Sequence, residues 1–349
     1  MNGFSGWRGA FFAALSMDGA CRPEADHSAM NEALSLFRFL GDCARRGERT
    51  ALVTLTDVTG GSARAPGTHM AVSECGASIG SFSGGCVEAA VIAEAQQVIL
   101  AGQPRTLRLG AGSPYIDIRL PCGGGIDLIF TPQPALDQID RLCVLLEQRQ
   151  PVAVSLTTGG QFDIAAAAAG DRTCWQDSRF VVRHDPALRL VVIGHGAEPG
   201  ALLRLALAYG AEALLLSPDS RCIDDAKRIG VPTVRLWTTG RCDRLATDAH
   251  TAIVMLFHDH DWETVLLLQA LEQDPFYIGA MGSRRTQAER RQRLLDAGGF
   301  PAAIDRIVGP IGMIPATRDP RTMAVSILAQ VVSAYESMIR DGSSSTVSI

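Results

Sequence analysis

The most unusual part of this sequence is a glycine-rich block that ends in a cysteine. Two glycine-rich stretches, 60–67 and 83–85, bracket a short predicted hairpin and lead to Cys86. If a helix begins at Cys86, its N-terminal amides stabilise a thiolate, whereas Glu88 in the first turn opposes one. Cys122 lies in a comparable Pro-Cys-Gly-Gly-Gly loop. Both thiols are candidates to face a ligand; the alternative is that they pack beneath tight turns.

A second candidate is the loop containing Gly194 and Gly196, which follows an apolar run and precedes a predicted helix. Backbone amides in such a loop, together with the N-terminus of the helix, can receive a phosphate. Asp219, just past the next strand, would then bind a ribose hydroxyl. Because Gly200 comes one position late and Pro199 restricts the loop, a strand-to-helix turn without a cofactor is the alternative.

A third candidate is a Gly-Ser-Arg-Arg loop that follows a predicted strand and opens an arginine-rich helix. Oriented backbone amides and guanidinium groups suit a phosphate or a carboxylate. The candidate residues are Gly282, Ser283, Arg284 and Arg285. Further along the helix, Arg290, Arg291 and Arg293 are interpreted as a solvated face.

A run of alternating histidine and aspartate, 258–261, follows the carboxyl end of another predicted strand. Open α/β sheets place ligands at that edge, and both residue types bind metals and move protons. The alternative is that Asp259 or Asp261 only caps the helix that begins near Trp262.

The elements that must position these residues fall into five ranges. Residues 1–29 lack periodicity and are expected to form a loose N-terminal arm, and 341–349 a polar tail. Residues 30–135 predict an α+β domain with glycine-rich loops. Residues 136–187 are expected to connect it to a second domain, 188–340, and contain a predicted helix followed by β-like runs.

The second domain alternates apolar runs with helical segments, which predicts a doubly wound parallel sheet with helices on both faces. Its first helix is expected over 201–209, and Asp319-Pro320 is expected to open a long C-terminal helix. The fold class is therefore α/β, with a Rossmann-like C-terminal domain. The strands of this domain are expected near 190–193, 213–216, 233, 252–257 and 276–278.

Composition narrows the classes of function. The chain has 349 residues, and 32 basic and 37 acidic side chains give a net charge of −5. We therefore expect no general binding to nucleic acid, which needs clustered positive charge. No apolar run approaches the ~20 residues that cross a bilayer, so we expect no membrane span. Nine unevenly spaced cysteines without a C-x-x-C pair favour a reducing cytoplasm over a disulfide framework or zinc ribbon.

Three blocks in this order resemble the xanthine dehydrogenase accessory protein family, over about residues 51–334. They are Gly61-Ser62-Ala63-Arg64-Ala65-Pro66-Gly67-Thr68-His69-Met70 with Gly84-Gly85-Cys86-Val87-Glu88; Tyr277-Ile278-Gly279-Ala280-Met281-Gly282-Ser283-Arg284-Arg285; and Gly309-Pro310-Ile311-Gly312 followed by Ala324-Val325-Ser326-Ile327.

The resemblance implies a non-catalytic maturation chaperone for molybdenum hydroxylases of the xanthine dehydrogenase type, including aldehyde oxidoreductases. Such a protein binds the molybdenum cofactor, as molybdopterin or its cytosine dinucleotide form. It holds the cofactor while a cysteine desulfurase supplies sulfur, and delivers it to the apoenzyme, often as a homodimer.

On this hypothesis Cys86, and with it Cys122, would face the molybdenum end, since a soft metal suits a thiolate. Polar or phosphate groups would be anchored by Arg64, Ser283, Arg284 and Arg285, and by backbone amides at Gly84, Gly85, Gly194, Gly196 and Gly282. Two alternatives stay open. One is an NAD(P)-dependent oxidoreductase that uses the 194–200 loop, and the other is a scaffold between desulfurase and apoenzyme.

Overall fold

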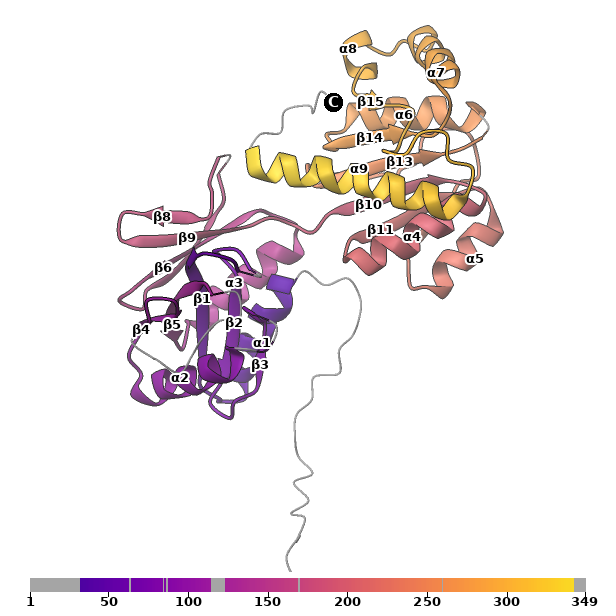
Figure 1. Ribbon diagram of the computed structural model, residues 1–349. Helices are drawn as coiled ribbons and strands as arrows, with labels where there is room; N and C mark the ends of the chain where they lie inside the picture. The colour runs from indigo at the N-terminus through magenta and orange to yellow at the C-terminus, as the bar shows by residue number, and fades with distance from the viewer. Residues whose placement is uncertain are drawn as a thin grey trace, which may run out of the picture.

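The computed structural model describes residues 32–341, apart from residues 63, 84, 86, 114–122, 169 and 259. The expected N-terminal arm and most of the polar tail lie outside the described residues. Within them the chain forms two units, joined by the segment between β9 and β10 (Figure 1).

The first unit begins with a five-stranded antiparallel sheet in the order β3-β2-β1-β5-β4. Residues of β1 alternate between its two faces: Val53 packs under α2, whereas Leu52 packs against α1 and α3. These elements are α1 (Glu32–Arg45), β1 (Thr50–Thr59), β2 (His69–Ser73), β3 (Ser78–Ile79), α2 (Glu88–Ala101), β4 (Arg105–Gly110), β5 (Gly125–Pro132) and α3 (Leu136–Glu147).

The range expected to connect the domains holds more structure than a connection. After α3 it forms an antiparallel sheet in the order β7-β6-β9-β8. Val154 and Phe180 of this sheet share a core with Phe37 of α1 and Leu142 of α3. The first unit is thus two sheets with α1 and α3 between them. The strands are β6 (Val152–Thr157), β7 (Phe162–Ala166), β8 (Cys174–Gln176) and β9 (Arg179–His184).

The second unit confirms the predicted Rossmann-like fold. Its six parallel strands have the order β12-β11-β10-β13-β14-β15, which is the order 3-2-1-4-5-6 of dinucleotide-binding folds. The strands are β10 (Arg189–Gly194), β11 (Glu212–Ser217), β12 (Thr233–Arg235), β13 (Thr251–Leu256), β14 (Tyr277–Ala280) and β15 (Ile307–Val308).

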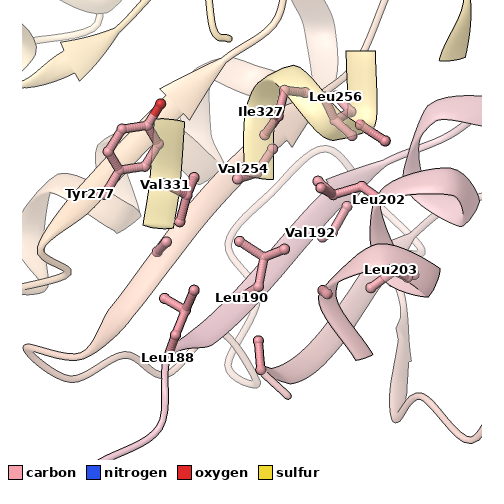
Figure 2. Packing of buried hydrophobic residues seen from close by; sticks show 14 of the residues in the cluster. Leu188, Leu190, Val192, Leu202, Leu203, Val254, Leu256, Tyr277, Ile327 and Val331 are labelled. Carbon is pink, nitrogen blue, oxygen red and sulfur yellow. The ribbon is translucent and has the colours of Figure 1, made fainter. Parts of the chain in front are cut away.

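Helices cover both faces of this sheet. On one face α4 and α9 pack on Leu190, Val192 and Val254 (Figure 2). On the other face Val191 and Ile253 pack against α6 and α7. The helices are α4 (Ala197–Tyr209), α5 (Ser220–Arg228), the 3-10 turn η1 (His260–Trp262), α6 (Glu263–Glu272), α7 (Arg284–Asp296), α8 (Pro301–Ile304) and α9 (Pro320–Asp341).

The stretch Pro320–Arg340 of α9 is, by length and composition, long and apolar enough to cross a membrane. One of its faces nevertheless lies in the core, where Ala324, Ile327 and Val331 pack on the sheet and α4. A helix that covers a sheet in a packed core passes the same test of composition.

The two units meet at the amino ends of the parallel strands. Arg149, just after α3, donates through Nε to Asp248 Oδ2 at 2.7 Å, and its Nη1 lies 2.7 Å from Glu212 Oε1. Asp248 precedes β13 and Glu212 begins β11. The carboxyl ends of the strands, where such folds bind ligands, therefore lie a strand length of roughly 20 Å beyond this junction.

Candidate binding site

A cavity of about 610 Å³ opens at the carboxyl ends of β13, β14 and β15. Its first wall runs from Met281 to Thr286, and its second wall runs from Pro310 to Arg318. His258 completes the rim beside β13. Of the residues predicted from sequence, Gly282, Ser283 and Arg284 line this pocket. Arg285 does not line it, because its side chain points to solvent and pairs with Glu289 at 2.8 Å.

Gly282 and Ser283 give the first wall its shape. Gly282 has φ +139°, and a Cβ there would lie 2.6 Å from Thr286 Cγ2, so only glycine fits. Ser283 is the N-cap of α7, and its Oγ accepts a hydrogen bond from the Thr286 amide at 3.1 Å. Arg284 is the first residue of the helix, so its guanidinium and the positive end of the helix dipole lie at the same wall.

The second wall is held by α9. Gln330 Oε1 accepts hydrogen bonds from the Gly312 amide at 2.7 Å and from the Tyr277 hydroxyl at 2.9 Å. Ser326 Oγ accepts from the Ile314 amide at 2.7 Å. Gly312 has φ +102° and leaves no room for a Cβ, which would lie 2.5 Å from Ser326 Oγ. The third sequence block of the family resemblance is therefore a loop and the helix that anchors it.

Arg318 supplies a second cation that sequence reasoning missed. It lies in the second wall, just before Asp319, which accepts a hydrogen bond from the Thr322 amide and so caps α9 as predicted. In the sequence, Arg318 is marked only by its position next to the predicted helix start at Asp319-Pro320. A helix start does not predict a pocket. Within the described part of the chain, neither Arg284 nor Arg318 forms an ion pair with a carboxylate.

Apolar and soft side chains make up much of the remaining lining. Met281, Met313 and Met323 contribute thioethers, and Ile314 contributes an aliphatic side chain. Methionine adapts its shape readily and packs well against aromatic rings. The pocket therefore combines two cations and a helix N-terminus with a soft apolar surface. That combination suits an anionic group attached to a flat ring.

The loop at 194–196 carries a carboxylate where a dinucleotide would place its pyrophosphate. Gly194 packs so tightly on β13 that a Cβ would lie 2.3 Å from Leu256 O, and Gly196 is the N-cap of α4. The Glu198 side chain, 15% exposed, lies in the first turn of α4, 3.7 Å from His258 Nε2. Like charges repel, so Glu198 disfavours a phosphate at this helix N-terminus.

The structure differs from two of the expectations about this loop. The helix begins at Ala197 and not at residue 201, because Pro199 is compatible with the first turn of a helix. Asp219 caps α5, since its Oδ1 accepts a hydrogen bond from the Arg221 amide at 2.8 Å. Near the 258–261 run, the 3-10 turn η1 leads directly into α6, whose N-cap is Trp262; Asp259 lies outside the described residues.

In the first unit, the glycine loop before α2 already holds a carboxylate. Glu88 accepts hydrogen bonds from the amides of Phe82, Ser83, Gly85 and Val87, and from the hydroxyls of Ser81 and Ser83, at 2.8–3.2 Å. Burial alone would raise the pKa of Glu88, but these hydrogen bonds outweigh burial and hold its pKa far below the usual value. The Gly85 amide, expected to serve the cofactor, is thus used by Glu88.

The remaining predicted residues of the first unit do not join the pocket. Gly84, Cys86 and Cys122 lie outside the described residues. Arg64 lies before β2, and its Nη2 is 3.8 Å from Glu32 Oε1 at the start of α1. Neither Arg64 nor Gly85 lines the pocket that holds Ser283 and Arg284, and the first unit meets the second at the amino ends of the strands.

The expected solvated face of α7 is wrong for one of its three arginines. Arg290 is buried, with its side chain 3% exposed, and pairs with Glu263 of α6. Helix α7 packs on α6, so an arginine that the sequence pattern assigned to solvent faces a carboxylate instead. Arg291 does lie at the surface, where it pairs with Asp305, and Arg293 is exposed.

Comparisons with known proteins agree with this two-unit fold. A family model described as the XdhC Rossmann domain matches residues 190–331, and one described as the XdhC and CoxI family matches residues 43–110. A crystal structure of a xanthine dehydrogenase from Bacillus halodurans has the same fold, with a TM-score of 0.68. It is 21% identical, and the match covers 88% of this chain and 96% of that one.

Two curated relatives match along most of their length. A protein of Bacillus subtilis named as a probable xanthine dehydrogenase component is 22% identical over 82% of this chain and 93% of its own. The molybdenum cofactor insertion chaperone PaoD of Escherichia coli is 37% identical over 303 residues, which are 86% of this chain and 87% of PaoD. With this identity and the two matching family models, the chain belongs to the XdhC and CoxI family of xanthine dehydrogenase accessory proteins.

Proposed function

We propose that this protein binds the molybdenum cofactor, keeps it during sulfuration and delivers it to an apo molybdenum hydroxylase of the xanthine dehydrogenase type. The relative at 37% identity is named a molybdenum cofactor insertion chaperone, which supports a role in maturation. The observation that carries the proposal is the pocket with Arg284, Arg318 and the N-terminus of α7, in a chain of this family. We also propose that a cysteine desulfurase donates the sulfur and that the protein works in the cytoplasm as a homodimer.

The pocket suits the chemistry of this cargo. The cofactor is a pterin that carries a phosphate, in its mononucleotide or cytosine dinucleotide form. Arg284 and Arg318 would bind the phosphate beside the amides at Gly282 and Ser283. The thioethers of Met281 and Met313 would pack against the ring. His258, at the rim, is placed to hydrogen-bond polar atoms of the bound molecule.

The thiols are assigned a separate role. We propose that Cys86, and with it Cys122, faces the molybdenum end of the cofactor and that Arg64 anchors polar or phosphate groups. Cys86→Ala would then lower retention of the molybdenum cofactor, with the fold kept. The nicotinamide alternative has less support, because Glu198 occupies the N-terminus that a pyrophosphate would need.

The test compares binding of purified molybdopterin to variants at neighbouring arginines. Arg284→Ala and Arg318→Ala should each weaken binding about tenfold or more, because a hydrogen bond to a charged group contributes ~1.5–3 kcal/mol. Arg285→Ala is the matched control, since Arg285 is the next residue of the same helix but does not line the pocket. Unchanged binding by both pocket variants, or tight NADH binding with none to molybdopterin, would overturn the proposal.

A further inference from the structure

A buried ion pair lies behind the first wall of the pocket. Arg290 of α7 donates to both carboxylate oxygens of Glu263 of α6, through Nε and Nη2 at 3.0 Å each. Their side chains are 3% and 2% exposed. Removing two charges from water is costly, and apolar side chains would hold two helices together at least as well. The pair therefore calls for a role beyond attaching α7 to α6.

The remaining donors of Arg290 fix the first wall. Nη2 also donates to the carbonyl oxygen of Met281 at 2.6 Å, and Nη1 donates to Gln287 Oε1 at 2.6 Å. Met281 is the residue that precedes Gly282 and Ser283, and it lines the pocket itself. The guanidinium thus holds the loop that carries the N-cap of α7, from the side opposite to the cavity.

Gln287 extends the same network to the second wall. Its Nε2 donates to the carbonyl oxygen of Ile307 at 3.3 Å, at the start of β15. Its Oε1 also lies against Gly309, where a Cβ would come within 2.2 Å. Gly309 directly precedes Pro310, with which the second wall begins. The Gln287 side chain therefore links the segment that leads into the second wall to Arg290, which holds the start of the first wall.

We propose that Glu263, Arg290 and Gln287 are positioning residues that set the spacing of the two walls, and hence of Arg284 and Arg318, for the anionic group of the ligand. None of the three lines the cavity. They would act by holding the ligand-binding arginines in one geometry, since a site that loosens by about 1 Å loses much of its affinity. This inference rests on the proposed function of the pocket.

The test uses two leucine substitutions on one helix. Gln287→Leu removes the acceptor of Arg290 and the donor to Ile307, while the Arg290–Glu263 pair stays intact. Gln292→Leu is the matched control, because Gln292 is exposed on α7 and donates to Asp296 one turn later, away from both walls. The probe is purified molybdopterin, titrated well below the thermal midpoint of each variant. We expect about tenfold weaker binding for Gln287→Leu and unchanged binding for Gln292→Leu.

A second variant separates positioning from stability. Arg290→Lys keeps one charge against Glu263 but cannot also hold Met281 and Gln287, so it should weaken binding while the protein stays folded. A merely structural role would lower the midpoints of Gln287→Leu and Arg290→Lys and leave the affinity of the folded protein unchanged, which would overturn the inference alone. Unchanged binding by Arg284→Ala and Arg318→Ala would overturn the pocket itself.

Discussion

At the scale of single residues, two of the glycine-rich loops of this protein have a carboxylate from their own chain at a helix N-terminus. Glu88 accepts hydrogen bonds from backbone amides of the loop that precedes α2, and Glu198 lies at the N-terminus of α4. A loop whose amides already hold a carboxylate is rigid, but it is not an open phosphate site. The pocket at the Gly282 loop, by contrast, has no carboxylate among its described lining residues, and its charged lining groups are arginines.

The role of Glu88 predicts a pH-dependent contribution to stability. Glu88→Gln should lower the free energy of unfolding at pH 7 by about 2 kcal/mol, because hydrogen bonds to a charged acceptor contribute ~1.5–3 kcal/mol. The folded state holds the pKa of Glu88 below its usual value of 4.5, so this stabilisation is present above pH 4.5 and is lost as the pH falls below it. Urea unfolding of both proteins between pH 7 and about pH 3 measures the difference. A constant difference across this range would contradict the prediction.

At the scale of elements, the sheets of the first unit are linked by two imidazoles. His69 of β2 and His184 of β9 approach Nε2 to Nε2 at 3.2 Å, and the His69 Nδ1 lies 2.8 Å from Thr54 Oγ1. Phe37 of α1 packs edge-on against both rings. Two neutral imidazoles can share one proton between the facing nitrogens, whereas two charged rings repel.

This link predicts acid sensitivity of the first unit. Burial lowers the pKa of His69 well below 6.5, aided by His184, and burial lowers the pKa of His184 to about 4 despite the nearby Asp185. The unfolded chain therefore binds more protons, and stability should fall by about 2 kcal/mol as the pH drops from 6.5 towards 4. His184→Gln should flatten this part of the profile in thermal unfolding. His258→Gln, at an exposed site in the other unit, serves as the control.

Some features of the helices and strands could be predicted from the sequence, and others could not. The helix considered at Cys86 begins two residues later, at Glu88, and its buried stripe of Val91, Ala95 and Val98 is a local pattern that a sequence can show. The β-like runs within 136–187 were predicted, but not their assembly into a second sheet, because that sheet shares its core with α1, which is far away in sequence. The sequence pattern also could not predict that Arg290 is buried, because its partner Glu263 is 27 residues away. Helix and strand types follow local patterns, whereas burial of charge depends on long-range contacts.

At the scale of the whole molecule, the candidate groups divide between the two ends of the Rossmann sheet. Arg149 fastens the first unit to the amino ends of the strands, and its side chain is 7% exposed. Burial alone would raise the pKa of Asp248, but Arg149 and Thr251 lower it to about 2, so the ion pair persists at neutral pH. The pocket lies at the carboxyl ends. The pocket and the first unit therefore lie at opposite ends of the sheet in one chain, so the roles proposed for them can be tested separately.

The position of Arg149 at the junction of the two units predicts what its removal should do. Arg149→Ala removes the partner that the first unit provides to Asp248 and Glu212, and should lower the free energy of unfolding by about 2 kcal/mol and loosen the junction of the units. Limited proteolysis should then cut near residues 184–188. Arg189→Ala is the control, because Arg189 contacts the same carboxylates from within the second unit. If the pocket works alone, molybdopterin should bind to folded Arg149→Ala with wild-type affinity. A loss of affinity in Arg149→Ala, but not in Arg189→Ala, would mean that the first unit completes the site, and the division into two ends would be wrong.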